Sequence, residues 1–487
     1  MSYSILSEIQ SYLEKGDYDI VPIYKKFPAK DLTPMNILKE LKGNNQECYL
    51  LESADHQKRW SRYSFLGYNP VMSIACYDHQ IIVGQEKYRV DHPHDYLRNL
   101  LSHYKTPFIP SLPPFTGGLV GFFGYEYFHY NEPTLKRDKD DNEKIPDMYL
   151  MLFDTVICFD HQEHMIQLVT HVPIQNLEVE YQKGMQKLEE LHCMIQQNQK
   201  SLIPALQIKE PCLSLFSKEK YCEIVEQAKK HIYEGDIFQI VLSNRWEIEA
   251  KGSLIQIYEN LRETNPSPYM FYLSTEDLEI VGASPDTLVK LDDNKLYTYP
   301  LAGTRPRGKT IEEDKQNETD LLNDQKELAE HNMLVDLGRN DIGKISQFKS
   351  VRVEEYLSIL KYSHVMHIGS TVSGKILPDK DAIDAIDALL PAGTLSGAPK
   401  IKASSLIYEL EGHKRYLYGG AIGYIGFSGQ MDTCIAIRFA YKTKNKVYVS
   451  SGAGIVADSQ PEKEFQECCQ KAAAIMDALK CSQGGKL

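Results

Sequence analysis

The cysteine spacings of metal and redox sites are missing from this sequence. None of the ten cysteines forms a C-x-x-C pair, and Cys468 and Cys469 are simply adjacent. Scattered thiols of this kind are typical of a reduced cytosolic protein and not of a disulfide scaffold. No apolar run approaches the roughly 20 residues of a membrane-spanning helix, and the first residues lack the basic start and apolar core of a signal peptide. We therefore expect a cytoplasmic protein with no membrane partner.

Positive charge is also in short supply. The chain has 54 Lys and Arg against 67 Asp and Glu, and its formal net charge of −13 argues against an extended nucleic-acid surface. The sequence contains no G-x-S-x-G nucleophile elbow and no H-E-x-x-H zinc helix. Its 487 residues, 42% hydrophobic and 25% charged, have the composition of an ordinary globular protein with room for more than one domain.

Strand-like and helix-like segments alternate irregularly along the chain. This pattern predicts an α+β fold, an α/β sandwich with large mixed or antiparallel sheets that form a cleft and helices packed outside. We expect one region over residues 1–200, mostly strands, in which 148–160 (MYLMLFDTVICFD) is a strand and 136–144 a solvated charged loop. After a proline-containing linker, a second region spans 212–480 and opens with a helix capped by Ser217.

Two acidic pairs with the same spacing are the first candidates for chemistry. Glu327 and Glu330 lie in ELAEHNMLVDLGRND, which predicts a helix over 327–337 with both carboxylates on one face. Glu464 and Glu467 repeat the spacing in PEKEFQE, at the start of a final predicted helix. Carboxylates so placed repel each other unless they face water or a cation. A solvated helix edge explains either pair alone, whereas two pairs facing one cleft would form an oxygen-rich site for Mg²⁺.

Other candidates are weaker when taken singly. Arg438 closes the alternating strand TCIAIR, where its planar fork suits a carboxylate, although a lone Arg is more often part of a structural ion pair. The glycine-rich segments 451–454, 303–305 and 393–400 are predicted to be loops whose N–H groups can face an anion, or simply to allow close packing. His367 is by default a core histidine. Together these residues predict a metal-assisted site for a small carboxylate anion.

The ordered motifs of the second half resemble the chorismate-utilising enzymes, and among these the large subunit, component I, of anthranilate synthase. The motifs are GDIFQIVLS, NPSPYMF, GASP, LAGTRPRG, ELAEHNMLVDLGRND, YSHVMH, GTLSGAPK, YGGAIGY, DTCIAIR and GAGIVADS. The resemblance implies an N-terminal regulatory region and a C-terminal chorismate-binding region. It also implies that Mg²⁺ is held by Glu330 and Glu467, with Glu327 and Glu464 close by, and bridges to the ring carboxylate of chorismate.

The same resemblance assigns roles to further residues. His367 matches a catalytic histidine, and Thr394 a residue near the ring hydroxyl that leaves. The family's GASPE carries a Glu read as a general acid, whereas this chain has Asp286, one methylene shorter. The positions that match chorismate contacts are Gly303, Thr304, Tyr418, Arg438, Gly452, Ala453 and Gly454.

Two positions indicate the subfamily by resemblance. Isochorismate-forming relatives activate water with a Lys where this chain has Gln239, which cannot act as that base. Aminodeoxychorismate synthases usually carry a nucleophilic Lys where this chain has Ala302. The nucleophile is therefore expected to be ammonia and the product anthranilate, the first step of tryptophan biosynthesis. The alternatives are component I of aminodeoxychorismate synthase, in the folate pathway, and a catalytically silent tryptophan-binding module.

Regulation and partners also follow from the resemblance alone. Leu50-Leu51-Glu52-Ser53 and Pro268-Tyr269-Met270 match the two segments of a tryptophan feedback site, although buried strands would explain them equally well. We expect L-tryptophan to bind at Ser53, Pro268, Tyr269 and Met270 and to inhibit allosterically. The chain has no glutaminase motif, so a separate glutamine amidotransferase subunit (component II) would supply ammonia. The family pattern implies a hetero-oligomer of two large and two small subunits.

Overall fold

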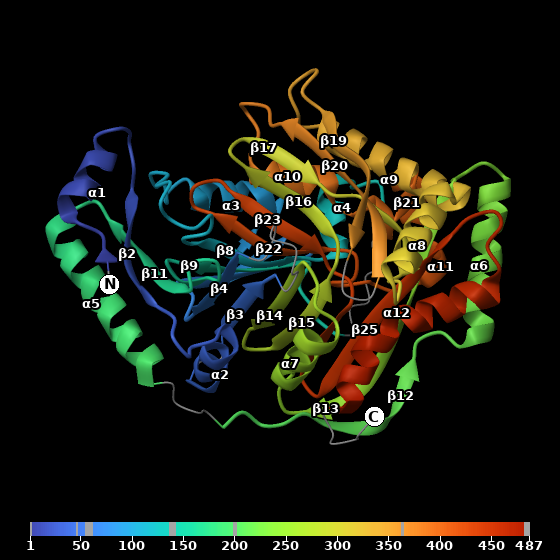
Figure 1. Cartoon of the computed structure of the whole chain (residues 1–487), viewed down its shortest axis with the longest axis horizontal. Helices are drawn as coiled ribbons and strands as arrows, with labels where there is room; N and C mark the ends of the chain where they lie inside the picture. The colour runs from blue at the N-terminus through green and yellow to red at the C-terminus, as the bar shows by residue number, and fades with distance from the viewer. Residues whose placement is uncertain are drawn as a thin grey trace.

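Two large sheets form the body of the protein. The structure, a computed structural model, describes residues 2–44, 47–53, 62–135, 143–197, 202–361 and 365–481. Within these ranges two antiparallel sheets pack on each other and helices lie outside them (Figure 1), so the predicted α+β class is confirmed. The charged loop predicted at 136–144 falls almost wholly outside the described residues.

Sheet A combines strands from both ends of the chain. Its spatial order is β1 (Ser2–Tyr3), β2 (Ile20–Pro28), β11 (Met165–Pro173), β10 (Thr155–Asp160), β4 (Tyr63–Tyr68), β3 (Cys48–Glu52), β14 (Tyr269–Ser274), β15 (Leu278–Ser284), β24 (Phe439–Thr443), β25 (Lys446–Ile455), β13 (Gln239–Lys251) and β12 (Gln207–Ser214), with β21 (Gly397–Ala398) paired to β13.

Sheet B is built in the same way. Its order is β18 (Leu301–Pro306), β20 (Val365–Lys375), β17 (Lys295–Thr298), β16 (Thr287–Asp292), β23 (Met431–Ile435), β22 (Ala421–Gly426), β8 (Gly118–Phe123), β9 (Met148–Phe153), β5 (Met72–Tyr77), β6 (Gln80–Val83) and β7 (Glu86–Arg89), with β19 (Arg352–Lys361) paired to β20.

Helices surround the two sheets. They are α1 (Leu6–Leu13), α2 (Pro34–Asn44), α3 (Pro93–Leu101), α4 (Phe128–Asn131), α5 (Leu177–Gln197), α6 (Lys218–Tyr233), α7 (Ile255–Thr264), α8 (Ile311–Asn323), α9 (Gln325–Gly343), α10 (Ala382–Leu389), α11 (Lys400–Glu411) and α12 (Pro461–Cys481), with short 3₁₀ turns η1 (Tyr125–Tyr127) and η2 (Gly393–Leu395). Ser217 caps α6 as predicted, accepting the Lys220 N–H. In the described part of the chain, no helix is both long and apolar enough to span a bilayer.

Sheet A is buried on both faces. In β10, Val156 and Cys158 belong to the core between the sheets, whereas Ile157 and Phe159 belong to the core under the outer helices. Side chains alternate along a strand, so a strand covered on both sides is apolar throughout. The run 148–160 is therefore not one strand: it leaves sheet B as β9 and enters sheet A as β10.

Both sheets join the two predicted regions. In sheet A, Glu52 of β3 pairs with Met270 of β14, and in sheet B, Gly118 of β8 pairs with Gly426 of β22. Strands from 1–200 and from 212–480 are thus neighbours in hydrogen-bonded ladders, and the core between the sheets draws residues from both regions.

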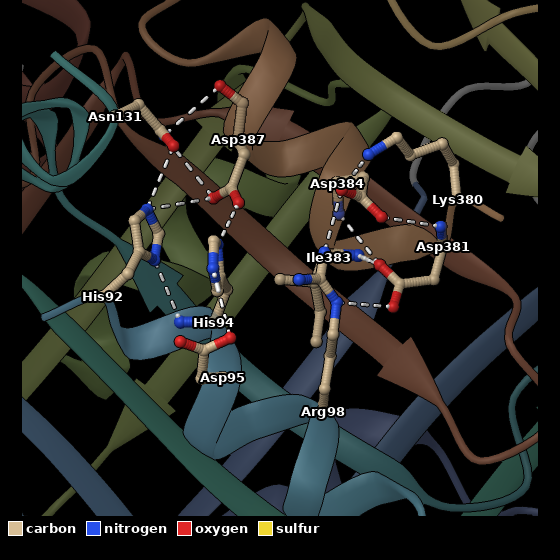
Figure 2. A network of polar contacts seen from close by, with 10 residues as sticks. All are labelled: His92, His94, Asp95, Arg98, Asn131, Lys380, Asp381, Ile383, Asp384 and Asp387. Carbon is tan, nitrogen blue, oxygen red and sulfur yellow. Dashed lines mark hydrogen bonds and ion pairs between the residues drawn. The ribbon is translucent and has the colours of Figure 1, made fainter. Parts of the chain in front are cut away.

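A polar network also links the regions, between α3 and α10 (Figure 2). His94 Nδ1 donates to Asp387 Oδ2 at 2.8 Å, and Arg98 Nε donates to Asp381 Oδ2 at 3.0 Å. The His92 and His94 rings stack with centroids 3.6 Å apart and planes only 21° apart. A metal ion lies in the ring plane of each histidine that binds it. The planes of two nearly parallel stacked rings do not intersect near the ring nitrogen atoms, so one ion cannot lie in both planes there. We therefore interpret the network as a hydrogen-bonded contact that holds α10.

Candidate active site

A cavity of about 560 Å³ lies where α9, α12, β18 and β25 meet. Most of the candidate site residues predicted from the sequence line it, although they come from distant parts of the chain. Those that line it are Asp286, Gly303, Thr304, Glu330, His367, Thr394, Tyr418, Arg438, Gly452, Gly454, Glu464 and Glu467. The predicted cleft therefore exists, and the two acidic helices face it together.

The acidic residues reach the cavity from α9 and α12. Asp324 caps α9 by accepting the Lys326 and Glu327 N–H groups, and one turn later Glu330 points to the cavity. Burial raises the pKa of Glu330, and the nearby Glu327 carboxylate raises it further. Burial, followed by the charge of Glu467, raises the pKa of Glu464, while a hydrogen bond with Ser459 opposes the rise. Glu327 itself is not part of the cavity lining.

Two lysines that the sequence reading missed also line the cavity. Lys471 Nζ lies 2.7 Å from Glu467 Oε1 and donates to the Gly452 carbonyl at 3.3 Å. Lys326 approaches from the first turn of α9. The spacing of Glu467 and Lys471, four residues apart on a predicted helix, was the available signal. Without a metal ion, Lys471 offsets part of the negative charge that gathers here.

His367 is held in one tautomer by β18. Its Nδ1–H donates to the Gly303 carbonyl at 2.8 Å, and the same nitrogen lies 3.1 Å from Thr304 Oγ1. A carbonyl only accepts, so Nδ1 carries the proton and Nε2 is the basic nitrogen of the neutral ring. Burial lowers the pKa of His367, while the Asp286 carboxylate acts in the opposite direction. The histidine is therefore oriented and stays neutral more readily than a free imidazole.

Asp286 lies in the turn between β15 and β16, where the chain crosses from sheet A to sheet B. Its carbonyl accepts the Ile435 N–H at 2.9 Å, and its own N–H donates to Ser284 Oγ at 3.3 Å. Burial raises the pKa of Asp286, and the charges of Arg438 and His367 oppose the rise. A buried carboxyl group with a raised pKa is suited to donate a proton.

Arg438 and the glycines of β25 differ from the sequence prediction. The strand before Arg438 ends at Ile435, and Arg438 follows it in a bend with a φ of 50°. The segment 451–454 is not a turn before a helix but part of the second half of β25. Its residues alternate, so Gly452 and Gly454 face the cavity while Ala453 packs in the core beneath α6 and α11. The Ala453 side chain therefore points away from the cavity, in contrast to the sequence prediction.

The 303–305 segment is also a strand, β18, with a bulge at Gly303, whose φ is 65°. The continuation through 310 reads GTRPRGKT, which has the spacing of a phosphate loop. Here, however, the Gly308 N–H donates to Asp314 Oδ1 at 2.8 Å and the Lys309 N–H donates to Glu313 Oε2 at 2.7 Å. The protein's own carboxylates occupy the N–H groups that a phosphate would need.

Thr394 and Ser53 each hold a buried hydroxyl oxygen for which the described residues provide no hydrogen-bond partner. Such atoms are uncommon in native proteins and are often completed by a ligand or water. Thr394 lies in η2 at the cavity. Ser53 follows β3 and is not part of the cavity lining; it is next to Glu52, which accepts the Tyr258 hydroxyl proton at 2.6 Å. The two tryptophan-site segments do adjoin, because β3 pairs with β14.

Comparison with known proteins agrees with this geometry. The sequence model for chorismate binding enzymes matches residues 46–477. Anthranilate synthase component 1 of Acetivibrio thermocellus is 40% identical over 491 residues, covering 98% of this chain and 99% of that protein. The same component of Acinetobacter calcoaceticus is 41% identical over 493 residues, covering 97% and 98%. The crystal structure of anthranilate synthase component I from Streptococcus pneumoniae TIGR4 matches with a TM-score of 0.75 at 38% identity, covering 85% of this chain and 92% of that one.

The chain therefore belongs to the family of chorismate binding enzymes, and it is an enzyme that uses chorismate. Its similarity to component 1 of anthranilate synthase extends over nearly the whole length of both proteins. This confirms the resemblance that the sequence motifs predicted.

Proposed function

We propose that the protein converts chorismate and ammonia to anthranilate, the first step of tryptophan biosynthesis. The observation that carries this proposal is the pair Gln239 and Ala302, which both line the cavity. A water-activating or covalently attacking Lys would have to stand at these positions, and neither residue can act as a base or nucleophile. An external nucleophile is then required, and we take it to be ammonia because anthranilate, the product in the relatives' name, carries an amino group.

The donor set of the cavity fits Mg²⁺. Glu330, Glu464 and Glu467 line one cavity, and their mutual repulsion is a contributing cause of the raised pKa values of Glu330 and Glu464. Neighbouring carboxylates repel one another, and a hard divalent ion that prefers oxygen ligands would offset that repulsion. In the proposal Glu330 and Glu467 hold the ion, with Glu327 and Glu464 near it. When bound, Mg²⁺ would neutralise the ring carboxylate of chorismate.

The remaining residues bind and orient the substrate. Arg438 and the Gly452 and Gly454 backbone would hold the enolpyruvyl carboxylate, a role that a planar guanidinium suits. Tyr418 closes the cavity beside Gly452, because a Cβ at Gly452 would lie 2.8 Å from the Tyr418 hydroxyl. Thr394 Oγ1 would hydrogen-bond the ring hydroxyl that leaves.

Asp286 is the proposed proton donor. Ammonia forms a C–N bond to the ring, the C–O bond to the 4-hydroxyl breaks, and the Asp286 proton passes to the departing oxygen so that water leaves. The added nitrogen returns its extra proton to Asp286. The ring then loses a proton, the C–O bond to the enolpyruvyl group breaks, and the enolpyruvyl methylene carbon takes up a proton, so that pyruvate leaves and anthranilate remains. His367, neutral and oriented by Gly303, lies near enough to Asp286 to influence its charge and to assist proton transfer.

The proposal includes a partner and an inhibitor. The relatives' name, component 1, supports a second component. In the proposal this partner is a glutamine amidotransferase subunit that supplies ammonia, and two subunits of each kind assemble. L-tryptophan would bind where β3 meets β14, at Ser53, Pro268, Tyr269 and Met270. The paired register of Glu52 and Met270 and the unpartnered Ser53 hydroxyl support this location.

The test is anthranilate fluorescence from the purified chain supplied with chorismate, MgCl₂ and ammonium at slightly alkaline pH. The proposal expects a rising signal that tryptophan suppresses, and no signal when glutamine replaces ammonium in the absence of the partner. Chorismate consumption without fluorescence would instead assign the protein to aminodeoxychorismate formation. No consumption would favour the silent tryptophan-binding module.

A further inference from the structure

Tyr269, the first residue of β14, reaches across the space between the sheets. Alternation along the strand places it on the same side as Phe271 and Leu273, which belong to the core between sheets A and B. Its hydroxyl oxygen lies 2.8 Å from Thr287 Oγ1 and 2.8 Å from Asp432 Oδ1. Both partners belong to sheet B, so one side chain joins the two sheets where the chain passes between them.

The turn that Tyr269 contacts is the one that carries Asp286. Thr287 is the next residue, and Ser284, two residues before Asp286, is the register partner of Tyr269 in sheet A. The other side of the turn is fixed by Ile435, whose N–H donates to the Asp286 carbonyl and whose carbonyl accepts the Ser284 hydroxyl proton at 2.7 Å. The backbone of the turn is thus held from β14 on one side and from β23 on the other.

The proton count gives this contact a direction. A carboxylate only accepts, so the Tyr269 hydroxyl proton is donated to Asp432, and Thr287 must donate its own proton to the Tyr269 oxygen. Thr287 is the first residue of β16, next to the Asp286 turn, whereas Asp432 lies further along the adjacent strand β23, opposite Lys290. The two hydrogen bonds tie the Thr287 hydroxyl to Tyr269 and, through it, to Asp432, which restricts the Thr287 rotamer.

We propose that Tyr269 is a positioning residue that holds the Asp286 carboxyl in the cavity by hydrogen-bonding to Thr287 and Asp432. This inference rests on the proposed function, in which Asp286 donates a proton to the leaving hydroxyl. Positioning matters here because the Asp286 side chain has only one methylene, so the reach of its carboxyl depends strongly on the backbone of the turn. Tyr269 touches neither the substrate nor the reacting atoms.

The test compares Tyr269→Phe with Tyr272→Phe. Tyr272 lies on the same strand, is more deeply buried than Tyr269, and donates its hydroxyl proton to Glu279 Oε1 at 2.5 Å, but it faces the outer helices. Both variants lose one buried hydroxyl bonded to a carboxylate. We expect kcat to fall roughly tenfold in Tyr269→Phe with the KM for chorismate within about twofold, and kcat to be unchanged in Tyr272→Phe. Equal kcat values in the two variants would overturn the inference.

A double-mutant cycle separates positioning from general loss of structure. In an Asp286→Asn background, which has no proton to position, Tyr269→Phe should have no further effect on kcat. A further tenfold loss there would mean that Tyr269 acts independently of Asp286, against the proposal. If Tyr269→Phe folds poorly, Thr287→Val is the alternative test. It removes the other end of the hydrogen-bond chain with little change of shape, and we expect the same fall in kcat. A Thr287→Val enzyme with wild-type kcat would contradict the proposal.

The wild-type enzyme separates this inference from the proposed function. If it makes no anthranilate from chorismate and ammonium, the proposed function fails before Tyr269 is tested. If it does, and Tyr269→Phe turns over like Tyr272→Phe, the proposed function stands and only the positioning role is lost.

Discussion

Glu467→Gln is the substitution that tests the proposed metal site most directly. It keeps the shape of the side chain but removes one charge from the acidic residues of the cavity. In the structure Glu467 pairs with Lys471, with the two side chains 47% and 46% exposed. An ion pair this exposed stabilises the fold by under about 1 kcal/mol, so the variant should remain folded with almost the same urea midpoint.

The effect on metal binding should be much larger. Loss of an outer-shell partner lowers the affinity for a metal ion roughly 10–100-fold. Loss of a carboxylate that holds Mg²⁺ directly should lower the affinity by at least as much. The concentration of MgCl₂ needed for half-maximal anthranilate fluorescence should rise accordingly, and calorimetric titration of the chorismate-free protein should show weaker Mg²⁺ binding. The calorimetric readout does not depend on turnover.

Glu462→Gln is the matched control for this experiment. Glu462 lies in the first turn of the same helix, is exposed, and is not part of the cavity lining. The variant therefore removes the same charge from the same helix without changing the cavity. We expect wild-type Mg²⁺ dependence in this variant. If Glu467→Gln also shows wild-type half-saturation by MgCl₂, Glu467 does not hold the ion and the proposed ligand set is wrong.

Three further predictions concern pH, substrate binding and inhibition. Burial, and next the charge of Asp147, raises the pKa of Glu126 from 4.5 to about 7. The folded protein therefore binds this proton more tightly than the unfolded chain does. The resulting stabilisation is fully present below pH 4.5 and is lost as the pH rises through about 7. Relative to Glu126→Gln, unfolding in urea should therefore show wild-type stability falling by about 3 kcal/mol across that range. Gly452→Ala should raise the KM for chorismate at least roughly tenfold, because the new Cβ would lie 2.6 Å from the Leu242 carbonyl oxygen and displace β25. Ser53→Phe should fill the proposed effector site and abolish tryptophan binding measured by calorimetry.

Each of these has a contrary outcome. Parallel pH profiles for wild type and Glu126→Gln would mean that Glu126 titrates normally in the fold. The control for Gly452→Ala is Gly454→Ala, whose Cβ would meet only the movable Gln239 amide at 3.0 Å and should therefore have a milder effect. Equal KM values for the two would contradict the argument from backbone contact. Undiminished tryptophan affinity in Ser53→Phe would move the effector site elsewhere.

The helices of the site could be predicted from sequence because their signals are local. The segment around Glu330 consists of good helix formers and has no Pro or Gly before Gly338, and the structure confirms the predicted helix. Its end was predicted too early, at Leu337, whereas α9 continues to Gly343. Gly338 is tolerated inside the helix because Thr298 packs against it: a Cβ there would lie 3.0 Å from the Thr298 methyl carbon. That contact comes from another strand and leaves no trace in the local pattern.

Sheet membership could not be predicted in the same way. The run 148–160 is apolar apart from Asp154, Thr155 and Asp160, and one long buried strand or two successive buried strands would give the same pattern. Only long-range pairing with β8 and β4 assigns its two halves to different sheets. The glycine-rich segment 451–454 was mistaken for a turn for a related reason. Glycine in a strand marks close backbone approach, here of Gly452 to Leu242, as readily as it marks a turn.

The interleaving of the two regions in both sheets has a consequence for how this enzyme can be taken apart. If residues 1–200 were removed, β14 would lose β3 and β22 would lose β8, leaving two unpaired edges in the middle of what are now continuous ladders. Exposed central strands of this kind invite pairing with other chains. The two regions share both sheets, so exchange of the N-terminal half between relatives would require matching strand registers.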